Sequence, residues 1–366
     1  MRTNGADPAR RLSAQNFSLV IGGPLYQLLR RVRLEDDAAQ LVRRRIVIFL
    51  ALTWLPLLLA TAAEGLAWDG RVAVPFLRDV AAHARFLAAL PLLIVAELVV
   101  HRRIRDIVAQ FLERGLIVDS EMERFDRAID KAIGLRNSVP AELLLLGLVY
   151  GAAASGIWGQ YIGLQTPTWY LPVVGPGARH SIAGWWLAWV SLPIFQFLLL
   201  RWYFRLLIWA RFLWHLSRLE LRLVPTHPDG VAGLAFVGNV AYAMAPLAAA
   251  HGALVAGLLA EMIFQQGAKL PEFTIELFSI VVFMLCLVVG PLLVFAPMLA
   301  ALKRRGNRVY GALAQSYVRE FDAKWIGGDA APEEPLIGSA DIQSLADLTN
   351  ALNVIRTMQI VPFTRQ

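Results

Sequence analysis

The chain has 366 residues, of which 57% are hydrophobic and 17% are charged, and its mean hydropathy is +0.53. Soluble domains carry about 25% charged residues, so this composition excludes an ordinary soluble protein. The net charge of +7 would suggest nucleic acid as a partner, but the basic residues cluster beside long apolar runs, and we expect no nucleic-acid partner. The single cysteine, Cys286, excludes a disulfide framework and a Cys/His metal site.

Six apolar segments are long enough to cross the ~30 Å hydrocarbon core as helices. They cover approximately residues 46–66, 84–104, 141–163, 182–203 (continuing as a helix toward residue 221), 234–264 and 273–301. The sequence therefore predicts an all-α polytopic membrane protein, a bundle of six transmembrane helices with cytosolic amphipathic helices. Proline interrupts four of these spans and permits kinks there.

The distribution of basic residues predicts the orientation. Thirty of the 35 lysines and arginines fall in the N-terminal segment, two alternate connections and the C-terminal segment, and five fall in the other three connections. Cytoplasmic loops carry the excess of basic residues, so both termini are predicted to be cytoplasmic.

Three parts of the chain are predicted to lie on the cytoplasmic side: residues 1–45, 105–136 and 303–366. The first contains an apolar stripe beside arginines over residues 25–32, which is typical either of a helix lying on the membrane surface or of one packed on the protein itself. The second is predicted to be a helical hairpin within the 46–302 membrane domain, with a capping box at Ser120–Glu123 and a stop at Gly134. The third is predicted to contain a helix over 310–325 and a last helix capped by Ser339. The stripe of Ile342, Leu345, Leu348, Leu352 and Ile355 then needs a partner, either the hairpin or another subunit.

Two ionisable residues lie deep in the predicted spans, Glu97 in the second and His251 in the fifth. A charge at the bilayer centre costs about 3 kcal/mol even on the lenient insertion scale, so both should face protein or water. One interpretation is an ion or proton path lined by Glu97 and His251, with Gln196 as a third lining group. The other is structural: a neutral His251 bonded to a backbone carbonyl, and Glu97 paired with Arg102 or Arg103.

Glu64, Glu261 and Glu276 fall at the outer ends of spans, where they would either attract cations as a mouth or pair separately with nearby basic residues. The third span carries small residues at every fourth position, which let helix backbones approach closely. They favour packing within the chain, with a subunit interface or a pore-lining helix as alternatives: Gly147, Gly151, Ser155, Gly159 and Gly163.

The turn Thr226–Gly230 precedes the fifth span. As structure, Asp229 caps the helix that follows; as a site, His227, Arg222 and Gly230 would hold an anion or a lipid headgroup. Motifs of hydrolases, zinc proteases and nucleotide-binding loops are absent from the sequence, so no catalytic residue, metal or cofactor is expected.

The run Thr226-His-Pro-Asp-Gly-Val-Ala-Gly-Leu234, the stretch Ser339–Leu348 and the closing Val361-Pro-Phe363 resemble uncharacterised bacterial multi-pass inner-membrane proteins. The resemblance covers a small part of the chain. It implies a bacterial inner-membrane location and assigns no activity and no functional residues.

These features favour transport, by a homo-oligomeric ion channel or a small ion- or proton-linked transporter with a path near the second and fifth spans. The first alternative is a non-catalytic membrane scaffold or signalling subunit that binds a cytosolic protein partner through its helices. The second alternative is an intramembrane lipid-modifying enzyme. A scaffold should expose an apolar patch on residues 342–355, and an enzyme should have a cavity where polar groups converge.

Overall fold

The computed structural model describes residues 17–20, 22, 38–68, 70–155, 167–173, 179–328, 335–336 and 339–363. Every regular element in these residues is a helix, and two isolated β-bridges, Val74–Thr168 and Ile117–Leu221, join loops. The predicted all-α class is confirmed. Five helical segments are long and apolar enough to cross a membrane, and a sixth is added if α7 and α8, bent by 42°, count as one span. The chain thus has the helices of a multi-pass membrane protein.

Several successive helical segments adjoin end to end, and we call each such series a column. In chain order the helical segments are α3 (Ala38–Thr53), α4 (Leu55–Glu64), η1 (Phe76–Arg78), α5 (Val80–His83), η2 (Ala84–Ala89), α6 (Leu90–Glu113), η3 (Asp119–Glu121), α7 (Met122–Arg136), α8 (Val139–Ala154), α10 (Ile182–Trp186), η4 (Leu187–Ser191), α11 (Leu192–Leu216), η5 (Ala235–Asn239), α12 (Val240–Ala243), α13 (Ala245–Gln266), η6 (Leu270–Phe273), α14 (Thr274–Val289), η7 (Gly290–Phe295), α15 (Ala296–Phe321), η8 (Asp322–Ile326) and α16 (Ala340–Thr357).

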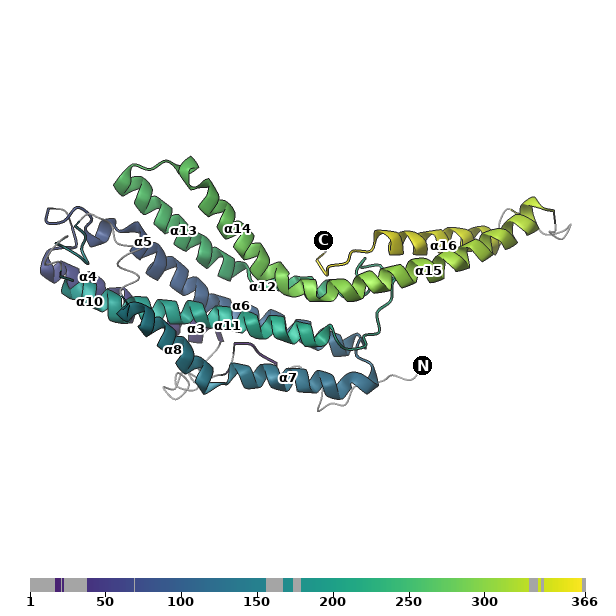
Figure 1. Cartoon of the computed structure of the whole chain (residues 1–366), viewed down its shortest axis with the longest axis horizontal. Helices are drawn as coiled ribbons and strands as arrows, with labels where there is room; N and C mark the ends of the chain where they lie inside the picture. The colour runs from purple at the N-terminus through teal and green to yellow at the C-terminus, as the bar shows by residue number, and fades with distance from the viewer. Residues whose placement is uncertain are drawn as a thin grey trace.

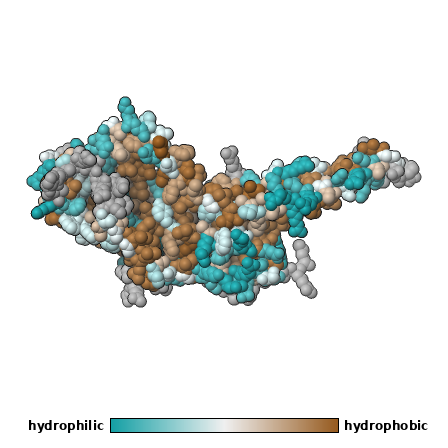
Figure 2. Space-filling model, viewed as in Figure 1, coloured by the Kyte–Doolittle hydropathy of each residue, from teal (hydrophilic) through white to brown (hydrophobic). Residues whose placement is uncertain are grey.

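Figure 1 shows an elongated molecule with two parts. Helices α3 to α14 form a body, and α15 with α16 forms a hairpin that projects from it, which we call the arm. The end of the body beside the arm is the arm end, and the opposite end, with α4, α5 and α10, is the far end. Hydrophobic side chains cover the middle of the body, and hydrophilic ones gather at its two ends (Figure 2). This distribution is the one that a lipid layer around the middle would select.

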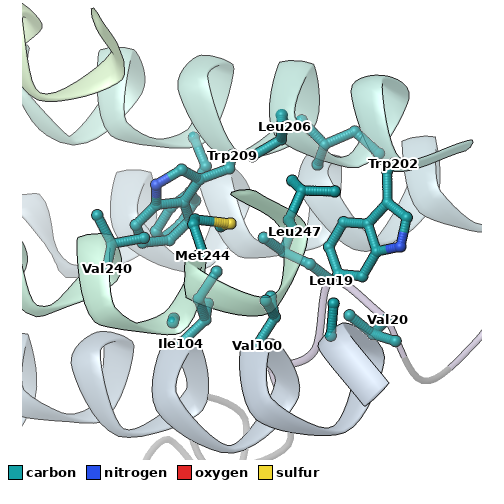
Figure 3. Close-up of a cluster of buried hydrophobic side chains, with 14 of the residues drawn as sticks. Leu19, Val20, Val100, Ile104, Trp202, Leu206, Trp209, Val240, Met244 and Leu247 are labelled. Carbon is teal, nitrogen blue, oxygen red and sulfur yellow. The ribbon is translucent and has the colours of Figure 1, made fainter. Parts of the chain in front are cut away.

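The core of the body lies where α6, α11 and the α12–α13 column meet. Val100 and Ile104 of α6 face Trp202 and Trp209 of α11, and Met244 closes the cluster (Figure 3). Both tryptophans are fully buried, and Trp202 Nε1 donates to the carbonyl of Leu93 at 3.0 Å. These two rings therefore belong to the core of the body and not to its surface. Because a buried indole N–H needs an acceptor, the carbonyl of Leu93 makes this position suitable for Trp202.

The prolines predicted to interrupt the spans sit at the starts of helices. Pro91, Pro193, Pro246 and Pro297 each lie in the first turn of an α-helix. Wider π-helical segments, η2 and η4, precede α6 and α11, and the 3₁₀ segment η7 precedes α15. Proline lacks a backbone N–H and is tolerated in the first turn of a helix. Because a segment of another helix type ends directly before the turns at Pro91, Pro193 and Pro297, the chain continues as a helix through these prolines. The columns stay continuous but not straight.

Two helices of the body bury little of their surface. None of the residues of α14 is buried, and Ile275 and Phe278 are among its exposed side chains. In α8, which packs on α11, only Glu142 and Val149 are buried. Within a lipid layer these apolar surfaces would contact acyl chains, so their exposure fits the membrane class.

The arm differs from the C-terminal structure that we expected. The expected boundary at residue 303 and the expected separate helix over 310–325 both fall within one column, because α15 runs without a break to Phe321 and η8 extends it to Ile326. Helix α16 packs on α15, a partner that we did not predict for its apolar stripe. Gly306 lies where the two helices are close, since a Cβ there would lie 3.2 Å from Ile355 Cγ2.

The chain after α16 returns to the body and fixes the base of the arm. Lys303 Nζ donates to the carbonyl of Met358 at 2.7 Å, and the backbone N–H of Gln359 donates to the carbonyl of Gly230 at 2.9 Å. Gly238 lies under the tail, where an added Cβ would come within 2.6 Å of the Pro362 carbonyl oxygen. The arm is therefore attached to the body both where α15 begins and through the chain that follows α16.

The predicted hairpin over 105–136 is also different in detail. α6 extends to Glu113, and α7 packs mainly against α11, burying Phe125 and Ile129. Helix α7 continues past Gly134 to Arg136, so glycine does not stop it. The N-cap of α7, Glu121, makes no side-chain capping bond, and the capping box at Ser120 does not form. A 3₁₀ turn, η3, precedes the helix and satisfies backbone groups at its start instead.

Candidate functional site

Three charged side chains from three helices meet inside the body. Glu97 of α6 binds Arg45 of α3 through Oε2, at 2.5 Å from Nη1, and Arg205 of α11 through Oε1, at 2.7 Å from Nη1. Each of the three side chains is at most 7% exposed. Glu97 therefore bridges two guanidinium groups, and the expected pairing with the arginines at positions 102 and 103 is wrong. A buried carboxylate held by two arginines is fully compensated by charge.

A second ion pair lies beside the first on α11. Arg201 Nε lies 3.4 Å from Glu142 Oε1 of α8, and both side chains are nearly buried. Arg201 and Arg205 are one helical turn apart, so they share a face of α11. The guanidinium of Arg205 also lies over the ring of Trp202, 5.1 Å from its centroid. These pairs connect α3, α6, α8 and α11 through charge.

The N-terminal residues Phe17–Val20 and Gly22 lie across this cluster, and we call them the N-terminal strap. Three arginines donate to every second carbonyl of the strap: Arg136 Nη1 to Ser18 at 2.5 Å, Arg205 Nη2 to Val20 at 3.4 Å and Arg201 Nη2 to Gly22 at 3.3 Å.

Apolar and polar side chains of the strap hold it as well. The ring of Phe17 stacks on Phe212 with centroids 5.0 Å apart, and Leu19 and Val20 enter the core (Figure 3). Ser18 Oγ lies 2.9 Å from His101 Nδ1. The strap is thus part of the body's packing and covers the arginine cluster.

The position of the cluster along the helices indicates its depth. Arg45 directly precedes an uncharged stretch of 18 residues (46–63), and Arg201 directly follows one of 20 residues (181–200). Glu142 directly precedes another uncharged stretch that lasts to residue 178. A helix of 18 residues is about 27 Å long, close to the thickness of the hydrocarbon core. The cluster therefore marks one edge of the apolar layer, the edge nearer the arm end.

His251 lies in a separate polar pair. Its Nδ1 is 2.8 Å from the carbonyl of Leu247, and its Nε2 is 2.7 Å from the hydroxyl of Tyr203. A carbonyl oxygen only accepts, so Nδ1 carries the proton, and in a neutral ring Nε2 then accepts from the tyrosine hydroxyl. The bond to a backbone carbonyl is the one that the structural interpretation expects. In the described chain Glu97 and His251 do not bond to each other. Glu97 binds two arginines, and His251 binds Tyr203 and the carbonyl of Leu247.

Gln196, the third predicted path residue, lies on α11 with its amide oxygen buried and without a hydrogen-bond partner. The three predicted mouth residues have three different surroundings. Glu64 accepts from the backbone N–H of Ile182 at 2.9 Å and so caps α10. Glu261 is half-buried on α13, and Glu276 is exposed on α14. Among the described residues, no group forms a hydrogen bond or an ion pair with more than one of these three carboxylates.

The turn before the fifth predicted span is organised by Asp229. Its Oδ1 accepts from the backbone N–H groups of Val231 and Gly233 at 2.9 and 3.0 Å, and its Oδ2 accepts from Ala235 at 3.1 Å. Burial raises the pKa of Asp229, but these three backbone bonds outweigh it and leave the pKa below its usual value.

The predicted anion site at this turn has its donors already occupied. The backbone N–H groups that would bind an anion bind the Asp229 carboxylate, and His227 Nδ1 lies 2.9 Å from Asp229 Oδ1. Arg222 faces Asp119 instead, at 3.8 Å, and the Gly230 carbonyl accepts from the C-terminal tail. The geometry is that of the structural alternative, in which Asp229 caps the helix that follows.

The small residues of the third predicted span are described only in part. Gly159 and Gly163 lie outside the described residues. A Cβ added to Gly147 or Gly151 would meet no atom within 4 Å, and Ser155 is exposed at the end of α8. In the described part of α8, these glycines do not bring another helix of the chain close.

The chain was compared with protein-family models, with curated proteins and with solved structures. None of the three comparisons finds a match.

Sequence reasoning missed the cluster because it counted Arg45, Arg201 and Arg205 only among the basic residues that indicate orientation and paired none of them with a carboxylate. A signal was available for two of them. Arg201 and Arg205 are four residues apart and are surrounded by large apolar side chains that continue the helical pattern of α11 to Leu216. Charges one turn apart within such a pattern indicate a buried ionic face when another helix supplies a carboxylate.

Proposed function

We propose that this chain is a bacterial inner-membrane protein with six spans and both termini in the cytoplasm. The bent α7–α8 pair then supplies the sixth span beside the five helical segments that pass the length and hydropathy test. The excess of basic residues in alternate connections supports this orientation. The arm then projects into the cytoplasm.

We further propose that the protein is a non-catalytic scaffold or signalling subunit that binds a partner protein through the arm. The observation that carries this proposal is the projection of the arm from the body (Figure 1). The 31 residues of α15 and η8 span roughly 46 Å. From Lys303 onward this column lies beyond the predicted sixth span, and with α16 it presents helix surface that the body does not cover.

The exposed face of α15 indicates the kind of partner. Val309 and Leu313 are each 54% exposed and lie one turn apart, so they form a short apolar stripe that α16 does not cover. Arg304, Arg305 and Arg308 lie beside this stripe on the same helix. An apolar stripe flanked by arginines fits an amphipathic partner helix whose own flanks are acidic. The exposed patch was expected on residues 342–355, but this helix packs on α15. We therefore assign the binding face to α15.

Transport remains the second candidate. It is supported by the buried Gln196 amide oxygen, which lacks a partner and would bind water or an ion in an open state. The other two expected path residues, Glu97 and His251, are engaged with side chains and carbonyls of the body.

The enzyme hypothesis has less support. The recess of about 460 Å³ beside α10 is lined by Ile182, Trp185, Trp186, Trp189 and Val190. It brings no ionisable side chain to its wall, whereas a catalytic site needs polar groups that converge.

Site-specific photo-crosslinking in the cells that make the protein tests the scaffold proposal. A photoreactive residue at Val309 or Leu313 should give one discrete adduct, and the same residue at Leu348, which faces α15, should give none. Reversal of charge at Arg305 should weaken the adduct at Leu313, because acidic flanks on the partner are then repelled.

Two results would count against the proposal in different ways. An adduct of twice the chain's mass would assign the arm to self-association and support the homo-oligomer instead of a different partner. If neither exposed position gives a discrete adduct, the arm has no protein partner. Ion flux into proteoliposomes, compared between the wild type and the variants His251→Ala and Glu97→Gln, tests the transport candidate separately.

A further inference from the structure

The arginine cluster holds more positive than negative charge. Four guanidinium groups, those of Arg45, Arg136, Arg201 and Arg205, lie along the N-terminal strap or beside it, and the described carboxylates paired with them are Glu97 and Glu142. The described groups therefore carry an excess of two positive charges. Three of the arginines complete their bonding with neutral carbonyl oxygens of the strap, which are weaker acceptors than charged oxygens.

One donor of the cluster is unused. Arg45 Nε is buried and has no hydrogen-bond partner, although Nη1 of the same guanidinium binds Glu97. The Arg45 side chain is 7% exposed, so water does not satisfy this donor freely. A buried N–H without an acceptor is costly, and an acceptor oxygen supplied from outside the chain would remove that cost.

The depth of the cluster in the membrane indicates which kind of molecule supplies that acceptor oxygen. The uncharged stretches that begin after Arg45 and end before Arg201 place the cluster at one edge of the apolar layer. Lipid headgroups lie at this depth, directly outside the hydrocarbon core. Arginine is suited to phosphate because its planar guanidinium offers paired donors to two oxygens.

We propose that the cluster of Arg45, Arg136, Arg201 and Arg205 binds the phosphate group of an anionic phospholipid. The phosphate supplies a charged acceptor to Arg45 Nε and reduces the excess positive charge, while the strap keeps its apolar contacts. The same chemistry is available from free phosphate, and the experiment below separates the two sources. The proposal assigns the anion to this cluster and not to the turn at Asp229, where the backbone donors are occupied. It does not depend on a partner for the arm.

Native mass spectrometry of the full chain released from lipid nanodiscs tests the proposal. Nanodiscs that contain phosphatidylglycerol as a minor lipid in phosphatidylcholine should yield protein that retains one phosphatidylglycerol molecule. In the variant Arg136→Gln the apparent affinity for phosphatidylglycerol should fall at least about tenfold, because one charge-assisted bond is lost. The variant Arg45→Lys keeps the charge and the pairing with Glu97 but lacks the Nε donor, and it should also retain less lipid.

The matched control is Arg103→Gln, which removes an exposed charge from α6 outside the cluster. It should retain phosphatidylglycerol as the wild type does. Equal retention by the wild type, Arg136→Gln and Arg45→Lys would overturn the proposal, because the lipid would then bind by general basic charge. Absence of bound phosphatidylglycerol from folded wild-type protein would overturn it too. Free phosphate at millimolar concentration should not displace the lipid; if it does, and binds in its place, the ligand is free phosphate at the same site.

Discussion

The ion pairs of Glu97 offer the sharpest test of how the body is held together. Replacing Glu97 with glutamine keeps the side-chain shape but removes the charge that Arg45 and Arg205 share, at 2.5 and 2.7 Å. Breaking a buried ion pair by removing one partner costs about 3–5 kcal/mol, because the remaining charge is buried without compensation. Here two arginines lose their counter-ion at once. We therefore expect Glu97→Gln to lower the free energy of unfolding by about 4 kcal/mol, a factor of about a thousand in the equilibrium constant.

The assay is equilibrium unfolding of the purified protein in mixed detergent micelles with increasing dodecyl sulfate, followed by tryptophan fluorescence. The control is Glu64→Gln, at a half-buried carboxylate that accepts backbone bonds at the start of α10, where about 1 kcal/mol is expected. The double variant Glu97→Leu with Arg45→Met should be more stable than Glu97→Leu alone, because one of the two unpaired arginines is then gone. A loss below about 1 kcal/mol for Glu97→Gln, equal to that of the control, would refute the reasoning that this carboxylate compensates buried arginines.

Three further predictions concern other contacts. Tyr203→Phe removes the hydroxyl that binds His251 Nε2 and should lower the free energy of unfolding by about 1–2 kcal/mol in the same micelle assay; no change would mean that another donor satisfies the imidazole. Asp229 has a lowered pKa, so its stabilising effect is present above the usual aspartate pKa and is lost as the pH falls through the lower folded-state pKa. The melting-temperature difference between wild type and Asp229→Asn should therefore shrink toward acid pH, and a difference independent of pH would contradict this. Hydrogen bonds from Lys324 and Trp325 lower the pKa of Asp341, so Asp341→Ala should speed amide exchange at the tip of the arm, measured by mass spectrometry, and leave exchange in α6 unchanged.

The helical class was predictable because apolar runs of this length have few alternatives to membrane helices. Each of the six predicted spans overlaps a helix of the body, and the predicted extension of the fourth toward Leu221 is confirmed as far as Leu216. The ends were harder to predict. The fourth span was predicted to end at residue 203, close to Arg201 and Arg205, whereas both arginines are buried within α11, where Glu142 and Glu97 of other helices neutralise them. One sequence does not reveal which carboxylate will face which arginine across helices.

The same limit applies to the arm and to the deep polar residues. The stripe of α16 was recognised from its spacing, but spacing shows which face of a helix is apolar and does not show that α15 covers it. His251 was correctly singled out as a residue that needs partners, and the neutral alternative describes its bonds. Tyr203 and the carbonyl of Leu247, which supply them, were not predicted. For Glu97 the expected partners were its neighbours in sequence, whereas the structure supplies arginines from α3 and α11.

The N-terminal strap also has a consequence for biosynthesis. The strap contacts residues 179 and 185 positions later in the chain, at Arg201 and Arg205. At a synthesis rate of about 5–20 residues per second, the ribosome needs roughly 10–40 s after making the strap to produce these arginines. Arg45 and Glu97 are made first and can neutralise each other as α3 and α6 enter the membrane, before α11 exists. The strap is therefore made early but is among the last segments to reach its place. The order of synthesis keeps Glu97 from entering the membrane without a counter-ion.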